Sequence, residues 1–262
     1  MAGAAGKQGT GKGKTAMSQE TDGAVSVMKR YELKYLPDRG QTAYLVNRLK
    51  GHMEPDRYGM TSIASLYFDT PDRRLITASL ENPGFKEKIR LRSYGPATEC
   101  SPVFLELKRK ASGIVYKRRV QATIPEVREF FGGADGLFAD RQISRELNWF
   151  RDYYRPLQPA CLVICDRVAY FEPGGDLRLT IDYRPRYRME NLSLTGPADG
   201  IPLRPEGDTV LEIKVQGSMP LWLAAILDEG QIYRCGFSKY GEAYRQQHGA
   251  ARTEYPVLRA AG

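Results

Sequence analysis

Histidine and cysteine are scarce in this sequence, which has two histidines and four cysteines among its 262 residues. His52 and His248 each stand beside a glycine in polar surroundings, which argues against a histidine-based catalytic triad and against a zinc site. The cysteines are Cys100, Cys161, Cys165 and Cys235, without a recognised metal-ligand spacing. Cys161 and Cys165 lie four apart in ACLVIC, so we expect them on one strand face as small buried apolar residues.

Long apolar runs are missing as well. The best candidate, PLWLAAIL at 220–227, is far shorter than the roughly 20 apolar residues that a membrane-spanning helix needs. The amino-terminal stretch has no apolar region of the kind found in secretory signals. We therefore expect no membrane span and a reduced, cytoplasmic protein.

A complete phosphate-binding loop is also lacking. Residues 1–24 are rich in glycine, alanine, serine, threonine and lysine, and are predicted to form a disordered tail. They contain GKGKT, which resembles the end of such a loop. The motif requires a glycine five residues before Gly13, where this sequence has Gln8, and no strand precedes it. We therefore reject that interpretation.

From residue 25 onward, runs with strand-like composition dominate and are separated by turn signals. The predicted strands lie near 28–36, 62–69, 86–94, 102–110, 114–124, 161–171, 176–184 and 209–216. Helices, which are fewer, are predicted in 39–53, 125–133, 140–155, 219–230 and 238–249. The sequence thus predicts one α+β domain over 25–249, followed by a frayed tail over 250–262. Eight strands suffice to close a barrel that holds side chains or one ligand.

Five of these strands share one alternating pattern, with an apolar face and a charged face. KIRLRSY, for example, places Lys88, Arg90 and Arg92 on one face against Ile89 and Leu91 on the other. The other charged-face positions are Arg30, Glu32, Lys34, Glu106, Lys108, Lys110, Arg178, Thr180, Asp182, Glu212 and Lys214. The spelling E-x-K recurs in three of these strands.

Two arrangements would explain this pattern. The charged faces could be the solvated surface of a sheet whose other face packs on helices. Alternatively, the apolar faces point outward under helices and the charged faces line a tunnel. The concentration of charge and the repeated E-x-K pairs favour a shared interior. The net charge of +8 favours an anionic partner, and arginine, lysine and carboxylates together suit metal-assisted phosphoryl transfer.

Eight short motifs carry a family resemblance over about 27–247. They are, in order, RYELKY, SLYFDT, KIRLRSYG, FLELKRK, DRVAYF, LRLTIDY, LEIK and FSKYGEAY. In this set and order the chain resembles the catalytic domain of the vacuolar transporter chaperone (VTC) polyphosphate polymerases, which belong to the triphosphate tunnel metalloenzymes.

The resemblance implies an eight-stranded antiparallel β-barrel with a charged lumen, in which a nucleoside triphosphate binds with Mn²⁺ or Mg²⁺. The phosphate-binding, catalytic cations it implies are Lys34, Arg90, Arg92, Lys108, Arg167, Arg178 and Lys239. Further nucleotide-binding positions are Lys88, Lys110, Lys214 and Ser238. Glu212 resembles the metal-binding glutamate, with Glu106, Asp182 and Glu32 as additional candidates. The expected ligands are ATP and inorganic polyphosphate or pyrophosphate.

One position departs from the pattern of the triphosphatase members, which begin with E-x-E-x-K. Here Arg30 occupies the first acidic position, which resembles the polymerase branch and puts efficient activation of water in doubt. The sequence therefore favours a polymerase. A triphosphate or polyphosphate hydrolase and a non-catalytic polyphosphate-binding module remain as alternatives. No nucleic-acid-binding signature accompanies the basic charge.

Overall fold

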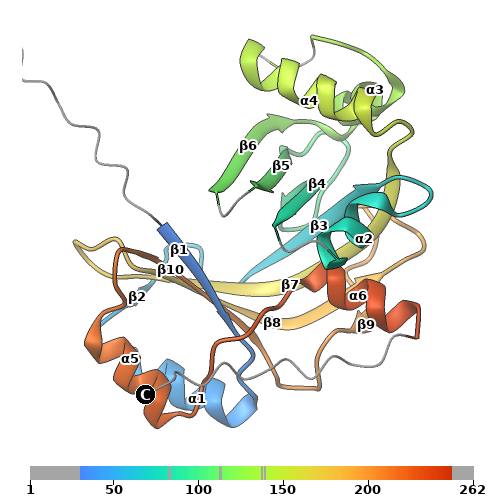
Figure 1. Ribbon diagram of the computed structural model, residues 1–262. Helices are drawn as coiled ribbons and strands as arrows, with labels where there is room; N and C mark the ends of the chain where they lie inside the picture. The colour runs from blue at the N-terminus through green and yellow to red at the C-terminus, as the bar shows by residue number, and fades with distance from the viewer. Residues whose placement is uncertain (1–29, 82–83, 112–113, 137, 139, 250–262) are drawn as a thin grey trace, which may run out of the picture.

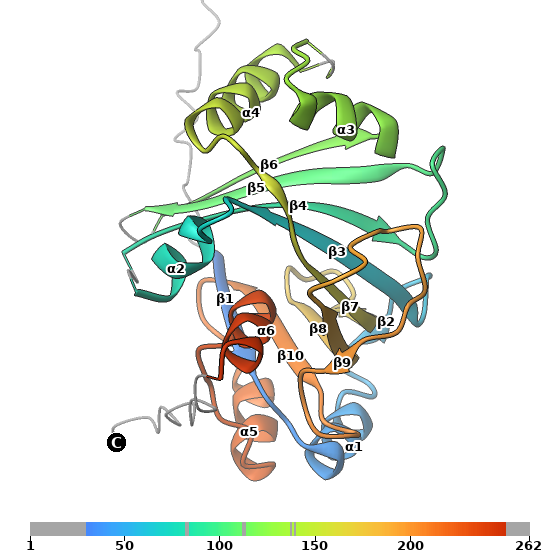
Figure 2. The same ribbon diagram turned by 90° about the vertical axis from the view of Figure 1, so that its right-hand side faces the viewer.

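The computed structural model describes residues 30–249 except 82–83, 112–113, 137 and 139. The two predicted tails, at 1–24 and 250–262, lie outside the described residues, and so does the GKGKT stretch. The described part forms one sheet with helices around it (Figures 1 and 2).

The sheet is antiparallel throughout, and its eight main strands follow the order β1-β10-β8-β7-β3-β4-β5-β6. These strands are β1 (Arg30–Tyr35), β3 (Thr61–Asp69), β4 (Phe85–Tyr94), β5 (Val103–Ala111), β6 (Ile114–Ala122), β7 (Gln158–Phe171), β8 (Arg178–Arg188) and β10 (Val210–Gln216). Two short strands, β2 (Glu54–Pro55) and β9 (Ile201–Pro202), pair with β7 and β8. The predicted α+β class and the eight-stranded antiparallel arrangement are confirmed. The sheet is strongly curled, and in the described residues β1 and β6 form its two unpaired edges.

Six helices occur in the described residues. They are α1 (Arg39–Arg48), α2 (Arg74–Glu81), α3 (Ile124–Gly132), α4 (Arg141–Tyr153), α5 (Leu221–Glu229) and α6 (Lys239–Gln247). Side-chain caps begin most of them: Thr123 and Glu126 form a capping box at α3, and Asp140 accepts two backbone N–H bonds at α4. Five of the helices lie where the sequence predicts them, whereas α2 was not predicted.

Helix α2 begins at an unusual cap. The carboxylate of Asp69, which ends β3 and is fully buried, accepts hydrogen bonds from the backbone N–H groups of Leu75 and Ile76 at 2.9 and 3.0 Å. It also accepts the Tyr240 hydroxyl of α6 at 2.9 Å. Asp69 of SLYFDT therefore fixes both α2 and α6 on the sheet, and links two of the recognised motifs through one buried carboxylate.

The main hydrophobic cores lie on the convex side of the sheet. Ile89 and Leu91 of β4 are 0% and 3% exposed and pack in the core that contains Phe130 of α3 and Phe150 of α4. A second core joins β1, β8 and β10 to α1 and α5, with Ile213 at its centre. The apolar strand faces thus point outward under helices, which is the inverted arrangement that the charge pattern favoured.

The concave side is mostly charged, but helix α6 fills one end of it (Figure 2). Tyr240 of α6 stacks on Tyr67 of β3, with ring centroids 4.8 Å apart. Cys161 of β7 joins this small apolar cluster, and Cys165 is buried nearby on the same strand. Burial raises the pKa of both thiols to about 12, so they are apolar filling rather than nucleophiles, as expected.

Candidate functional site

One wall of the concave face is built around the buried carboxylate of Glu106 on β5, which is 2% exposed. Four cations surround it: Arg90 at 2.8 Å, Lys117 at 3.0 Å, Arg119 at 3.7 Å and Arg92 at 3.8 Å. Burial alone would raise the pKa of Glu106, but the cations, led by Arg90 and Arg92, lower it to about 2. The carboxylate is therefore ionised and reduces the repulsion among the cations that β4 and β6 bring together.

Neutral side chains of β3 orient the two arginines of β4. Arg90 donates from Nε to Glu106 at 2.8 Å and from Nη1 to the Tyr67 hydroxyl at 3.0 Å. Arg92 donates from Nε to the Ser65 hydroxyl at 3.2 Å. Cross-strand pairing explains both contacts, because Tyr67 is opposite Arg90 and Ser65 is opposite Arg92. The guanidinium forks are thus held in place before any anion binds.

A second wall is built around Asp182 of β8, which is fully buried. Arg167 of β7 donates to both of its oxygens, at 2.5 and 2.7 Å, and Lys239 at the start of α6 lies 2.5 Å away. Burial would raise the pKa of Asp182, but Lys239 and Arg167 lower it to about 2. The same pairing raises the pKa of Lys239 despite its burial. Both carboxylate oxygens of Asp182 are thus engaged by these two cations.

Glu212 of β10 lies on the same wall but has looser contacts. Its oxygens lie 3.5 Å from Lys239, 3.8 Å from Lys34 and 3.9 Å from Arg167. Burial works against its charged form, yet these cations hold the pKa of Glu212 well below its usual range. Glu212 is therefore an ionised carboxylate whose oxygens are not committed to a short ion pair.

Side chains bridge the seam between the two edges of the curled sheet. Lys108 of β5 lies 3.3 Å from Glu32 of β1, although these strands are far apart in the strand order. Lys34 lies 3.6 Å from the same carboxylate and donates to the Phe237 carbonyl at 3.1 Å. The two walls therefore enclose one lumen, which ion pairs rather than backbone hydrogen bonds complete.

Lys88 lies at the end of the lumen next to α6. Its ammonium donates to the hydroxyl of Ser238, the N-cap of α6, at 2.8 Å. Burial and, after it, the nearby cations Lys34 and Lys86 together lower the pKa of Lys88 to about 7. The positive end of the α6 macrodipole points at the same place. This end of the lumen therefore favours the binding of an anion.

The lowered pKa of Lys88 predicts a pH-dependent stability. Between about pH 7 and 10 the unfolded chain keeps the Lys88 proton that the folded chain releases, so this residue makes stability rise with pH. We expect Lys88→Met to be more stable than the wild type at about pH 6, with a difference that shrinks toward about pH 9. Urea unfolding at both pH values measures this difference. Lys50→Met, at an exposed site on the outer surface, is the control, and an equal stability gain at both pH values would contradict the prediction.

Only one carboxylate of the predicted metal set is available for a metal ion. In the part of the chain that the structure describes, no three His, Cys, Asp or Glu side chains come together as a ligand group. Mg²⁺ and similar ions are often held by one or two carboxylates together with substrate phosphates. Glu212 fits this use, whereas Asp182 and Glu106 are engaged by short contacts to cations. Glu32 faces the seam and pairs with lysines.

The remaining predicted residues line the ends of the lumen. Lys214 is opposite Glu32 and Arg178 in the sheet, and its pKa is lowered by burial. Arg178 is exposed and donates to the carbonyls of Gly175 and Leu177 at the end of a hairpin. Lys110 of β5 lies on the charged face near Lys86. The structure therefore brings the predicted cations to one lumen, with Arg178 at its edge.

The lining cations of β6, Lys117 and Arg119, were missed from the sequence. They alternate as lumen residues should, but Arg118 between them is also charged and hides the pattern. Arg118 points outward and forms a bidentate pair with Glu146 of α4 at 2.7 and 3.0 Å. An arginine–glutamate pair on the outer face thus replaces the apolar residue that would have revealed an alternating strand.

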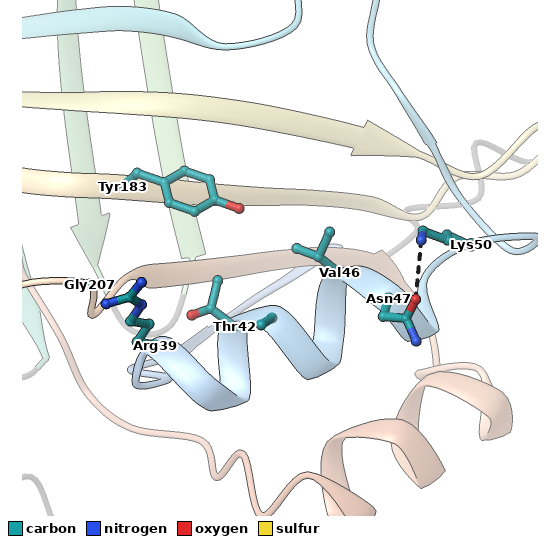
Figure 3. Close-up of a pocket in the computed structure, with 8 residues that line it drawn as sticks. Arg39, Thr42, Val46, Asn47, Lys50, Tyr183 and Gly207 are labelled. Carbon is teal, nitrogen blue, oxygen red and sulfur yellow. Dashed lines mark hydrogen bonds between the residues drawn. The ribbon is translucent and has the colours of Figure 1, made fainter.

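One cavity lies outside this lumen. It has a volume of about 500 Å³ and lies between α1 and β8, beside Arg39, Val46, Tyr183 and Gly207 (Figure 3). None of the lumen residues lines it. The cavity lies on the outer side of the sheet, away from its charged face.

The curled antiparallel sheet and its cationic lumen define a tunnel-type domain. The family described as the VTC domain matches residues 29–248, and this chain belongs to that family. No curated protein matches the chain significantly. No helix in the described residues is both long enough and apolar enough to cross a membrane.

One solved structure supports the fold, and a second gives a lower TM-score. A provisionally assigned adenylate cyclase from Bacillus halodurans gives a TM-score of 0.50 at 15% identity and covers 80% of this chain and 96% of its own. A provisionally assigned adenylyl cyclase from Hippeastrum, described as having a dominant triphosphatase activity, gives a TM-score of 0.48 at 18% identity, with 84% and 96% coverage. At such identities the likeness concerns the fold alone.

Proposed function

We propose that this protein is a cytoplasmic polyphosphate polymerase that transfers the γ-phosphate of ATP to a growing inorganic polyphosphate chain. Membership of the VTC domain family supports a triphosphate or polyphosphate ligand. The observation that carries the proposal is the convergence of two cationic walls on one lumen, each wall built on a buried, ionised carboxylate. Such a lumen is an unfavourable place for cations unless a polyanion enters it.

The proposed chemistry needs positioning and charge stabilisation rather than a protein nucleophile. An oxygen of the terminal phosphate of the chain attacks the γ-phosphorus, the new P–O bond forms, and the β–γ bond breaks so that ADP leaves with the bonding electrons. Arg90 and Arg92 offer preorganised forks for phosphate oxygens, and Arg167 and Lys239 hold the opposite wall. Glu212 would hold Mn²⁺ or Mg²⁺, and the metal would supply positive charge that offsets the charge of the phosphates.

The lysines near α6 suggest a path for the polyphosphate chain. Lys86, Lys88 and Lys110 lie on the charged face at this end, and the pKa values of Lys86 and Lys88 are lowered by burial and mutual repulsion. Lysine is a compact charge on a flexible stem, so it can follow a repeating phosphate chain without fixing one register. A growing product would relieve the repulsion among these ammonium groups.

The test is incubation of the purified protein with ATP and Mn²⁺, followed by separation of orthophosphate from polyphosphate on a gel and by ³¹P NMR. We expect long-chain polyphosphate and ADP. Release of orthophosphate alone would identify a hydrolase of the same fold. Binding of tripolyphosphate without turnover of ATP would identify a polyphosphate-binding module. Either of the last two results would overturn the proposal that the protein is a polymerase.

A further inference from the structure

The lumen has one mouth that combines aromatic rings with arginines. Tyr94 ends β4 and Phe104 lies on β5, and their ring centroids are 5.7 Å apart in an edge-on arrangement. The Arg119 guanidinium lies 3.8 Å from the Phe104 centroid and 5.4 Å from that of Tyr94. Arg92 lies 6.0 Å from the Tyr94 centroid. We call Tyr94, Phe104 and Arg119 the aromatic platform.

Tyr94 and Arg119 of the platform are exposed although they face the lumen, and Phe104 is half-buried. Tyr94 is 45% exposed, and the Arg119 side chain is 35% exposed. The other aromatic pair on the concave face, Tyr67 and Tyr240, is buried and stacked on itself at the α6 end. Exposed aromatic and guanidinium planes are the surfaces on which nucleobases stack. The platform mouth offers such planes beside the phosphate-binding wall around Glu106.

The same arginines connect the platform to that wall. Arg119 and Arg92 contact Phe104 or Tyr94 on one side and Glu106 on the other. Tyr94, Arg92 and Arg90 alternate along β4, so successive side chains on this face are about 7 Å apart along the strand. A ligand with a flat ring at one end and phosphates at the other would therefore span the platform and both arginine forks.

We propose that the aromatic platform binds the base of the nucleoside triphosphate, which fixes the direction of the nucleotide in the lumen. The base lies at the Tyr94 mouth, and the γ-phosphate points inward toward Lys239 and Glu212. The chain then approaches the γ-phosphate from the lysine-lined end near α6. This assignment rests on the proposed function, and it gives the site a preference for a nucleotide over a bare triphosphate.

The experiment compares the binding of Mg²⁺–ATP and Mg²⁺–tripolyphosphate by calorimetry in the wild type, Tyr94→Leu and Phe104→Leu. Leucine keeps apolar volume but removes the stacking plane. We expect each variant to bind ATP about tenfold more weakly and tripolyphosphate with unchanged affinity. Tyr116→Leu is the matched control, because Tyr116 is 48% exposed on β6 and lies opposite the outward-facing Arg109. In saturation-transfer NMR, the transfer of magnetisation from tyrosine protons to adenine H8 should disappear in Tyr94→Leu. It should remain in Phe104→Leu and Tyr116→Leu.

Three other outcomes would contradict the proposed base-binding role of the aromatic platform. Unchanged ATP binding in both variants overturns it, and so does equal weakening for ATP and tripolyphosphate, which would show a general role in the phosphate site. A wild type that binds tripolyphosphate as tightly as ATP also overturns it. Failure of the polymerase is seen separately: ATP binding that depends on Tyr94 without polyphosphate formation would leave the platform standing and remove the proposed activity.

Discussion

Replacing Arg92 with alanine should lower kcat/KM for ATP-dependent polyphosphate formation by about 100- to 1000-fold, the loss typical of one preorganised donor to transition-state charge. Arg92 suits this test because its contacts with Ser65 at 3.2 Å and with Glu106 at 3.8 Å are weak. Its loss should therefore leave the fold nearly intact. Arg90 is a poorer choice, because it ties Glu106 to Tyr67 through short hydrogen bonds. Polyphosphate synthesis at varied ATP concentration measures the change.

Two further variants sharpen this prediction. Arg92→Lys keeps the charge but loses the planar fork, so it should recover only part of the activity. Arg118→Ala is the matched control, because this arginine of β6 points outward to Glu146 and should leave kcat/KM within about twofold of the wild type. Equal losses in Arg92→Ala and Arg118→Ala would mean that the charge of the protein as a whole, and not the lumen, sets the rate.

The strands and the lumen were predictable because strand geometry converts sequence parity directly into a face. Lys88, Arg90 and Arg92 alternate without interruption, so their common face follows from the two-residue period alone. The concentration of charge predicted that this face lines the interior. The apolar faces point outward because they pack in the cores under α3, α4, α1 and α5. Parity failed at β6, where Arg118 is charged for an unrelated reason.

Contacts between segments far apart in the chain could not be predicted from the sequence. Helix α2 is short, and its cap comes from Asp69, five residues before its first residue, rather than from a residue next to it. The partners of Glu106 and Asp182 come from other strands and from α6, so their pairing with cations could not be separated from a metal-binding role. The sequence supplied the groups in the lumen, and only the fold shows how they are paired.

Replacing Asp182 with asparagine should lower the free energy of unfolding by about 3–5 kcal/mol at neutral pH. The carboxylate is ionised there because its pKa is about 2, and it is fully buried between Arg167 and Lys239. Asparagine has nearly the same shape but leaves the two buried cations with only the more distant carboxylate of Glu212 as counter-charge. Urea denaturation without ligand measures the loss. Mg²⁺–tripolyphosphate should restore part of it, because the bound anion supplies the missing charge.

The control is Glu99→Gln, because Glu99 pairs with Arg128 at 3.2 Å and both side chains are exposed, at 51% and 69%. A solvent-exposed pair of this kind contributes about 0–1 kcal/mol, so this variant should remain close to the wild type. The double variant Asp182→Asn/Lys239→Met removes one of the stranded cations and should regain part of the lost stability. A loss of stability in Asp182→Asn no larger than that in Glu99→Gln would show that water reaches this wall freely. The preorganised charge on which the proposed catalysis depends would then be largely screened.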